Sequence, residues 1–264
     1  MKLIDSFNEK FNKKQRIYII LLIIFLLIFA VSSVFAFKAF YRPKNNDADK
    51  YKREVKTDNT EELPDNPIDF SKLQSDNNEV VGWISVPSTE EKIIDYPILQ
   101  SGFETDEDFY INHDIQKQYK SAGSIYIQKD NASDFTDFNT VIYGHNMLNK
   151  SMFGTLKRYR NAEYFKNNRT ITIYTPGHVL EYEIVSAFVF DDRLIISAYN
   201  YFMQDDKKQE FIDICRNPNT LAKNVVENFD VTVDDRLITL STCTSVDTER
   251  YLVVGKLVKD TKTK

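Results

Sequence analysis

The stretch Leu237-Ile238-Thr239-Leu240-Ser241-Thr242-Cys243-Thr244 decides the fold, and a second apolar run, Tyr251 to Leu257, follows it closely. Both runs are rich in aliphatic and β-branched residues and the connection between them is short and polar, which predicts a strand, a loop and a second strand. Cys243 ends the first strand among hydroxyl side chains, and Arg250 enters the second. A structural thiol usually lies in apolar surroundings, so Cys243 is either a reactive group facing a cleft or a half-buried residue at a strand end.

A second stretch, Asn139 to Asn146, predicts a short strand that ends in Gly144 and His145. The chain has three histidines, so few imidazoles are available to a thiol. A nearby imidazole or guanidinium favours the thiolate, and such partners converge in space and not in sequence. His145 is therefore the first candidate partner for Cys243.

Three segments together resemble the sortase family, most closely its class B branch. They are Tyr143-Gly144-His145-Asn146, Thr239-Leu240-Ser241-Thr242-Cys243 and Arg250, and an N-terminal apolar segment accompanies them. The resemblance covers roughly residues 68 to 258. It implies a cysteine transpeptidase in which Cys243 forms a thioacyl intermediate, His145 transfers protons and Arg250 stabilises the developing oxyanion. It also implies a sortase-type barrel and, as partners, surface proteins with a sorting motif and a peptidoglycan or lipid-linked precursor amine.

Several other residues compete for these roles or flank the site. Thr242, Tyr143 and Asn146 either bind substrate or only support the strand ends. His113 lies in a predicted loop, and His178 lies beside a Pro-Gly turn where an exposed histidine is ordinary. Arg236 opens the cysteine strand and would lie about 20 Å from Cys243. Two carboxylates in the loop after Cys243 either orient the site or are simply solvated: Asp247 and Glu249.

Residues 17–37 form an apolar run of about 20 residues, which is long enough to span a bilayer as a helix. A cleaved signal peptide is the rival interpretation, but the run exceeds the usual apolar length of such a signal, so an uncleaved anchor is favoured. Basic residues lie on both sides of the run, so charge alone does not orient it. The short head of residues 1–16 and the resemblance both favour a cytoplasmic N-terminus and an extracellular catalytic domain.

Residues 38–67 are polar and charged and predict a juxtamembrane stalk, and residues 68–264 predict the catalytic domain. The only two cysteines are Cys215 and Cys243. A disulfide between them would exclude a thiol nucleophile. However, Cys215 shares an apolar helical face with Phe211 and Ile214, which predicts an ordinary core thiol.

Most signals in residues 68–264 are those of β-strands. Many short strands with turn signals and a few helices predict a mainly β fold, a closed barrel or a sandwich, and the resemblance narrows this to the barrel. A strand containing Pro97 is expected at a sheet edge. The expected strands are 80–86, 93–99, 124–127, 140–143, 170–174 and 180–190. The expected helices are 69–74, 152–165, 201–215 and 220–229.

Composition excludes several functions. With 264 residues, 42% hydrophobic residues and a net charge of −5, the chain has ample core material but no overall basic character for nucleic-acid binding. Histidine and cysteine are too sparse for a convincing metal cluster, and there is no Gly-rich phosphate loop or dinucleotide fingerprint. The sequence therefore predicts no cofactor.

Other enzyme classes fit less well. A papain-like peptidase would place Cys before His and at the start of a helix, and a chymotrypsin-like cysteine protease or an L,D-transpeptidase would carry glycine near the thiol. Ser241-Thr242-Cys243-Thr244 has none. A surface peptidase that only hydrolyses, and a membrane-anchored binding domain with an incidental thiol, stay open as alternatives.

Overall fold

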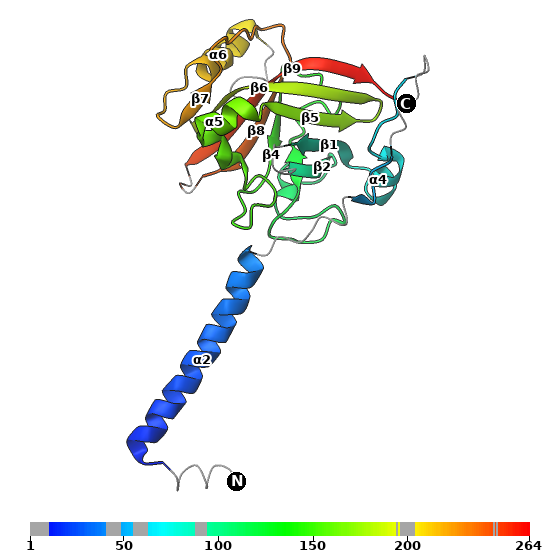
Figure 1. Cartoon of the computed structure of the whole chain (residues 1–264). Helices are drawn as coiled ribbons and strands as arrows, with labels where there is room; N and C mark the ends of the chain where they lie inside the picture. Colours follow the sequence, from blue (N-terminus) through cyan, green and yellow to red (C-terminus); the bar gives the residue numbers. More distant parts are fainter. Residues whose placement is uncertain are drawn as a thin grey trace. The chain divides into compact units, whose positions relative to one another are not determined.

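The computed structural model describes residues 11–40, 49–54, 63–87, 94–193, 195, 204–244, 246 and 248–264. The chain divides into two compact units, Met1–Pro43 and Lys44–Lys264. The described residues of the first unit form the helix α2, Lys13–Phe40 (Figure 1). Its segment Lys13–Phe37 is long and apolar enough to cross a membrane, and none of it is buried by protein. The predicted apolar span lies inside this helix.

The second unit is built on one sheet that closes on itself (Figure 1). Among the described residues, eight strands form the ring in the order β5-β1-β2-β3-β4-β8-β9-β6, and β5 pairs again with β6. β7 pairs with β6 outside the ring. The ring strands are β1 Val80–Val86, β2 Ile94–Gln100, β3 Ile125–Ile127, β4 Asn139–Tyr143, β5 Thr170–Thr175, β6 His178–Asp191, β8 Leu237–Cys243 and β9 Glu249–Lys262, with β7 at Lys223–Val225. The predicted closed barrel is therefore confirmed.

Alternate side chains of each strand point into the barrel or out of it, as the two-residue period of a strand requires. In β8, Ile238 and Leu240 belong to the interior cluster, whereas Leu237 packs outside. The outer face of β4, β8, β9 and β6 is covered by α6 at Asp205–Arg216, which buries Phe211, Ile212 and Cys215 there. The helix expected before the cysteine strand is thus present, although its predicted start at residues 201–203 lies outside the described residues.

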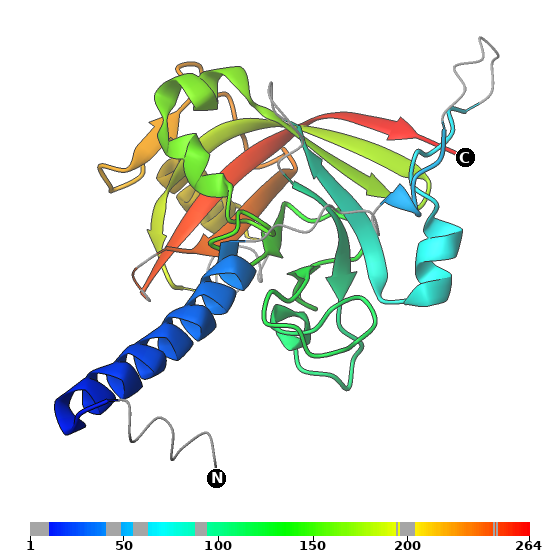
Figure 2. The same cartoon turned by 60° about the horizontal axis from the view of Figure 1, so that its bottom comes forward.

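A third apolar cluster lies on the outer face of β1, β2 and β3, where the helix α4, Phe70–Asp76, packs (Figure 2). Residues 49–54, predicted as part of the stalk, join this cluster. The ring of Tyr51 is 3% exposed and meets Trp83 edge-on with a centroid distance of 6.5 Å. Its hydroxyl donates to Asp76 at 2.6 Å. The folded unit therefore begins before residue 68, because Tyr51 supplies an apolar side chain within a polar stretch.

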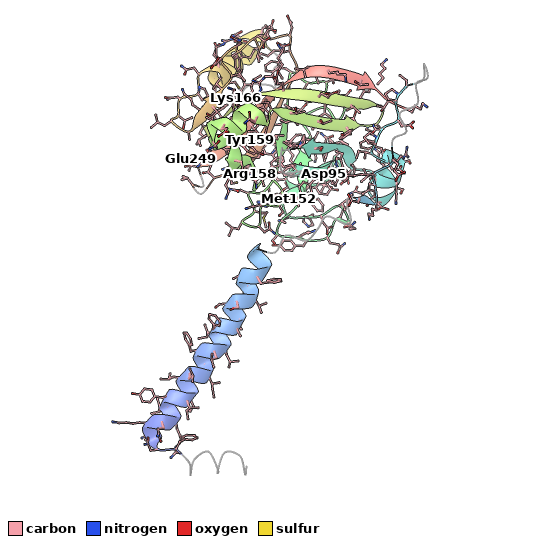
Figure 3. All side chains as sticks on the ribbon, viewed as in Figure 1. Asp95, Met152, Arg158, Tyr159, Lys166 and Glu249 are labelled. Carbon is pink, nitrogen blue, oxygen red and sulfur yellow. The ribbon has the colours of Figure 1, made fainter. Side chains whose placement is uncertain are left out.

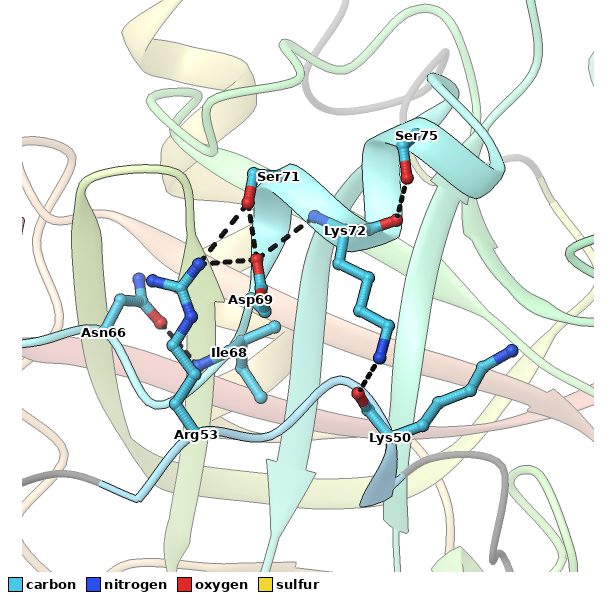
Figure 4. Close-up of polar contacts among 8 residues, drawn as sticks. All are labelled: Lys50, Arg53, Asn66, Ile68, Asp69, Ser71, Lys72 and Ser75. Atoms are coloured by element: carbon cyan, nitrogen blue, oxygen red, sulfur yellow. Dashed lines mark hydrogen bonds and ion pairs between the residues drawn. The ribbon is translucent and has the colours of Figure 1, made fainter.

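Polar contacts fasten the same segment to the start of α4 (Figure 4). The guanidinium of Arg53 reaches Asp69 Oδ1 at 2.5 Å, and the same oxygen accepts the N–H of Lys72 at 3.1 Å as the helix cap. The Asn66 side chain donates to the carbonyl of Thr175 at 2.9 Å and accepts the Ile68 N–H at 3.0 Å. The segment before β1 is consequently tied both to α4 and to the end of β5, the strand that pairs with β1.

Three local predictions are wrong. Residues 223–225 form β7 instead of a helix, and the β-branched side chains at Val225 and Val226 favour that extended backbone. Residues 152–165 form only a short 3-10 helix, η2 at Leu156–Arg160, and the first turn of α5 at Ala162–Asn167. β2 is not an edge strand: Pro97 lies just before Ile98–Gln100, the part that pairs with β3.

Tyr51→Ala is expected to lower the free energy of unfolding by about 3 kcal/mol, because it leaves a cavity beside a buried ring. Unfolding is followed by the fluorescence of Trp83, the single tryptophan. The matched control is Tyr119→Ala, since Tyr119 is 74% exposed and its loss should change the free energy by less than about 0.5 kcal/mol. Equal stabilities for the two variants would contradict the docking of residues 49–54.

Candidate active site

Three neighbouring strand ends bring the predicted catalytic segments together. β8 pairs in parallel with β4, where Tyr143 lies opposite Ser241, and antiparallel with β9, where Cys243 lies directly opposite Arg250. Because side chains alternate along each strand, Cys243 shares the outer face with Leu237, and Arg250 shares it with Leu252. The thiol and the guanidinium therefore start from adjacent backbone positions on the same face of the sheet.

Cys243 is the last residue of β8 and is exposed as a free thiol. Cys215 is also free, and it is fully buried on the inner face of α6. Burial raises the pKa of the Cys215 thiol, which keeps it protonated and inert. The structure therefore contains no bridge between them, and Cys215 is the core thiol that the sequence predicted.

His145 lies two residues beyond β4, half-buried, in a loop that is tied to β8 on both sides. On one side the Thr242 hydroxyl donates to the carbonyl of Gly144 at 2.7 Å. On the other, the Asn146 side-chain amide donates to the carbonyl of Cys243 at 2.9 Å. These two bonds bracket His145 and hold its backbone beside the end of the cysteine strand.

Close packing requires the glycine before His145. A Cβ atom at Gly144 would lie 2.5 Å from Cδ1 of Ile125 and 2.9 Å from Cδ2 of Phe153. The N–H of Gly144 donates to the carbonyl of Ser241 at 3.2 Å, and the N–H of Phe153 donates to the carbonyl of His145 at 3.0 Å. Any larger residue at position 144 would push the histidine loop away from Ile125 of β3 and from Phe153.

Arg250 is half-buried, and its Nη1 donates to the carbonyl of Glu249 at 3.1 Å. Between Cys243 and Arg250, the N–H of Thr244 donates to the carbonyl of Glu249 at 3.3 Å. The half-buried Glu249 carboxylate also accepts the Thr244 hydroxyl at 3.3 Å, so it supports the link between these two residues. The prediction for Asp247 lies outside the described residues.

An aromatic pair lies beside this site, and local sequence patterns did not predict the contact between its two rings. Tyr143 stacks on Tyr126 of β3 with a centroid distance of 5.5 Å. Tyr126 donates to Asp108 Oδ1 at 2.9 Å, and Gln128 donates to the same oxygen at 3.1 Å. Burial, with a smaller contribution from Asp108, raises the pKa of both phenols, so both stay protonated at neutral pH. Only the pairing of β3 with β4 reveals this contact.

The competing residues occupy other places. His113 stacks on Phe109 with a centroid distance of 3.9 Å, and its Nδ1 lies 2.7 Å from the Phe109 carbonyl. His178 and Arg236 both contact Asp260, at 2.6 and 2.8 Å, towards the end of the barrel opposite Cys243. All three have structural partners. Within the described part of the chain, no group of three or more His, Cys, Asp or Glu side chains is placed to hold a metal ion.

Comparisons with known proteins point to one family. The family model of the sortase domain matches residues 84–258. The chain is 34% identical over 213 residues to Sortase B of Listeria monocytogenes, covering 79% of this chain and 80% of that protein. The X-ray structure of Clostridium perfringens sortase B has a TM-score of 0.63 at 29% identity, covering 72% of this chain and 100% of that one. A Staphylococcus aureus sortase B-substrate complex has a TM-score of 0.62 at 28% identity, with 72% and 85% covered.

One thiol of the native protein is expected to react with iodoacetamide, and Cys243→Ala should abolish that labelling. Cys215 should react only after unfolding, because it is buried and its pKa is raised. The measurement is mass spectrometry of labelled peptides before and after denaturation, without added reductant. Labelling of Cys243 that requires a reductant would contradict the free thiol.

Proposed function

Because the chain belongs to class B of the sortase family and is a cysteine transpeptidase, we propose that it anchors surface proteins to the cell wall. In this proposal it cleaves a C-terminal sorting motif after threonine and transfers the protein to a peptidoglycan or lipid-linked precursor amine. The observation that carries the proposal is the direct pairing of Cys243 with Arg250, beside a histidine loop that two side-chain hydrogen bonds fasten to β8.

In the first half-reaction, the Cys243 thiolate attacks the carbonyl carbon of the scissile peptide bond. The C–N bond breaks, a thioacyl bond forms, and His145 gives a proton to the leaving amine. In the second, an acceptor amine attacks the thioacyl carbon, loses a proton to His145 and displaces the thiolate. Arg250 donates hydrogen bonds to the carbonyl oxygen as negative charge develops there, which a permanently charged fork does well.

The residues next to Cys243 and His145 are proposed to have two different roles. Tyr143 is proposed to line the substrate groove, because it lies on the same outer face as Cys243 and its ring stacks on Tyr126. Thr242 and Asn146 were candidates for substrate contact. Their hydrogen bonds to the Gly144 and Cys243 carbonyls support a positioning role instead, acting on His145 through its loop.

The proposed location is the cell membrane of a Gram-positive-type cell. The apolar helix α2 would cross the bilayer once, with a cytoplasmic N-terminus and an extracellular catalytic domain. The proposed substrates carry a motif of the Leu-Pro-x-Thr-Gly or Asn-Pro-x-Thr-Asn kind. The complex of a Staphylococcus aureus sortase B with substrate supports the expectation that this fold binds such a ligand.

The proposal is tested with the full chain in detergent and fluorogenic peptides carrying these motifs, with and without an amine acceptor. Cleavage after threonine is expected, with a ligated product when the amine is present. Cys243→Ala and His145→Ala should each lower kcat/KM by roughly a thousandfold or more. Arg250→Lys should lower kcat/KM about a hundredfold, because lysine keeps the positive charge but lacks the planar guanidinium and its paired N–H donors.

The control for Arg250 is Arg236→Lys, since Arg236 pairs with Asp260 towards the other end of the barrel and its loss should leave kcat/KM unchanged. Cleavage without ligation at any amine concentration would favour a peptidase that only hydrolyses. Activity that survives Cys243→Ala would overturn the nucleophile. A folded protein that binds these peptides equally well with and without the thiol and cleaves none would favour a binding domain.

Thr242→Val is expected to lower kcat/KM by about tenfold, because the carbonyl of Gly144 loses its donor and the histidine loop loosens. Thr242→Ser should restore activity. The matched control is Thr239→Val, which removes the buried hydrogen bond from Thr239 to Asn139, far from the loop. It should lower stability and leave kcat/KM of the folded protein within about twofold. Equal effects of both valine variants on kcat/KM would refute the positioning role.

A further inference from the structure

A cavity of about 420 Å³ lies beside the first half of β2. On the side away from β1, β3 pairs only with Ile98–Gln100, so the earlier residues of β2 have no strand partner on that side in the described part of the chain. Large apolar side chains form much of the lining: Tyr51, Trp83, Tyr96, Pro97, Ile125 and Met152. A cavity of this size, with apolar walls and a few polar groups, is typical of a small-molecule site. We call it the β2 cavity.

The rest of the lining is polar and has an excess of positive charge. Two ammonium groups, of Lys50 and Lys120, and one carboxylate, of Asp114, give it a net charge of +1. Lys50 has a carboxylate partner on α4, and Asp114 accepts the N–H groups of Gln116 and Gln118 at 3.0 and 3.1 Å. Among the described residues, no carboxylate forms an ion pair with the exposed Lys120. Lys120 is therefore available to an anionic ligand.

Met152, labelled in Figure 3, belongs both to the β2 cavity and to the histidine loop. Its N–H donates to the hydroxyl of Tyr96 at 3.3 Å, and its backbone forms an isolated antiparallel bridge with Asn146. The Asn146 amide donates to the carbonyl of Cys243, and the residue after Met152 donates its N–H to the carbonyl of His145. One wall of the cavity is thus the end of the loop that holds the catalytic histidine.

The histidine loop has an unfavourable backbone conformation at two positions. Lys150 and Met152 have φ angles of +64° and +49°, in the left-handed region that residues other than glycine rarely adopt. Such a conformation persists only where surrounding contacts stabilise it. Met152 is only half-buried, and it borders the open space of the β2 cavity. A ligand in the cavity would supply packing contacts that the protein itself does not make.

We propose that the β2 cavity binds an organic anion with a flat apolar body, such as an aryl carboxylate, and that this ligand stabilises the histidine loop. The apolar body packs on the aromatic lining and Met152, and the anion pairs with Lys120. A ligand favours the conformation to which it binds, here the one that holds His145 beside the end of β8. The effect on catalysis rests on the proposed function, whereas binding to the cavity does not.

The binding test uses the full chain in neutral lipid nanodiscs and two probes that differ in the anion, 1-naphthylacetate and 1-naphthylacetamide. Calorimetry, corrected with empty nanodiscs, should show that the carboxylate binds about fivefold more tightly, and the difference should shrink as salt rises. In Lys120→Gln the two affinities should become equal, with that of the amide unchanged. The matched control is Lys117→Gln in the same loop. Its ammonium pairs with Glu79 at 3.0 Å, so this variant should keep the preference.

Methionine methyl NMR signals locate the bound probe. The chain has four methionines, and Met152→Leu and Met147→Leu assign the two signals of interest. Binding should shift the signal of Met152 through the ring current of the naphthyl group. It should shift that of Met147 less, since Met147 lies in the histidine loop but does not line the cavity. Ile115→Phe, which enlarges a residue of the lining, should abolish binding of both probes.

The effect on catalysis is measured by chromatography of a cleaved sorting peptide. Saturating 1-naphthylacetate is expected to raise kcat/KM about threefold, with half of the effect at the dissociation constant found by calorimetry. In Lys120→Gln the same rise should require about fivefold more ligand, because only the affinity has changed.

Three results would overturn the proposal: equal affinities of the two probes in the unaltered chain, a preference that survives Lys120→Gln, or binding that leaves the Met152 signal unshifted. Binding in the cavity without a rise in kcat/KM would overturn the link to the histidine loop. Absence of peptide hydrolysis in the unaltered chain would count against the proposed function itself. In that case calorimetry and the methyl signals would still decide whether the cavity binds the anion.

Discussion

The register of β8 between β4 and β9 is the constraint on which the site depends. A shift of one residue would turn Cys243 from the outer face into the barrel and bring Ile238 and Leu240 out of the core. Apolar alternation resists such a shift, and a buried polar pair adds to the resistance. The Thr239 hydroxyl donates to Asn139 Oδ1 at 2.8 Å, and both residues are almost fully buried. A slipped strand would leave these groups buried without partners, which is costly.

The same register determines how the histidine is held. A loop after a strand end is normally the most mobile part of a sheet protein. Here the Thr242 hydroxyl and the Asn146 amide make hydrogen bonds to carbonyls across the junction, and Gly144 allows close contact with Phe153. The loop is therefore positioned by β8 itself, so the strand that carries Cys243 also holds the loop that carries His145. Packing of α6 and of residues 49–54 on two outer faces supports the barrel without entering the site.

Local patterns in the sequence were sufficient for most strands and for placing Cys243 at the end of one strand and His145 just beyond another, and the structure pairs these two strands, β8 and β4. These patterns reveal the alternation of apolar and polar residues in strands, the turn residues, and a thiol among hydroxyl side chains. The closed barrel was predicted from the number of strands together with the family resemblance. Local patterns were insufficient where tertiary contacts determine the burial or the backbone conformation of a residue. Tyr51 lies in a polar stretch, and only the cluster around Trp83 shows that it is buried. Residues 223–225 have a helical pattern but add to the edge of β6. The contact of Tyr126 with Tyr143 requires the pairing of β3 with β4, which no local pattern encodes.

The surroundings of Tyr143 combine burial with charges of both signs. Burial is the main cause of its raised pKa; Asp108, Glu107 and Asp130 add to it, and Arg250 opposes them. The ring of Tyr143 stacks on Tyr126, whose hydroxyl donates to Asp108 at 2.9 Å. Asp108 therefore ties its own segment to β3, and the aromatic pair joins β3 to β4, the strand that leads to His145. The outer face of the barrel thus supports the histidine loop through one hydrogen bond and one ring contact.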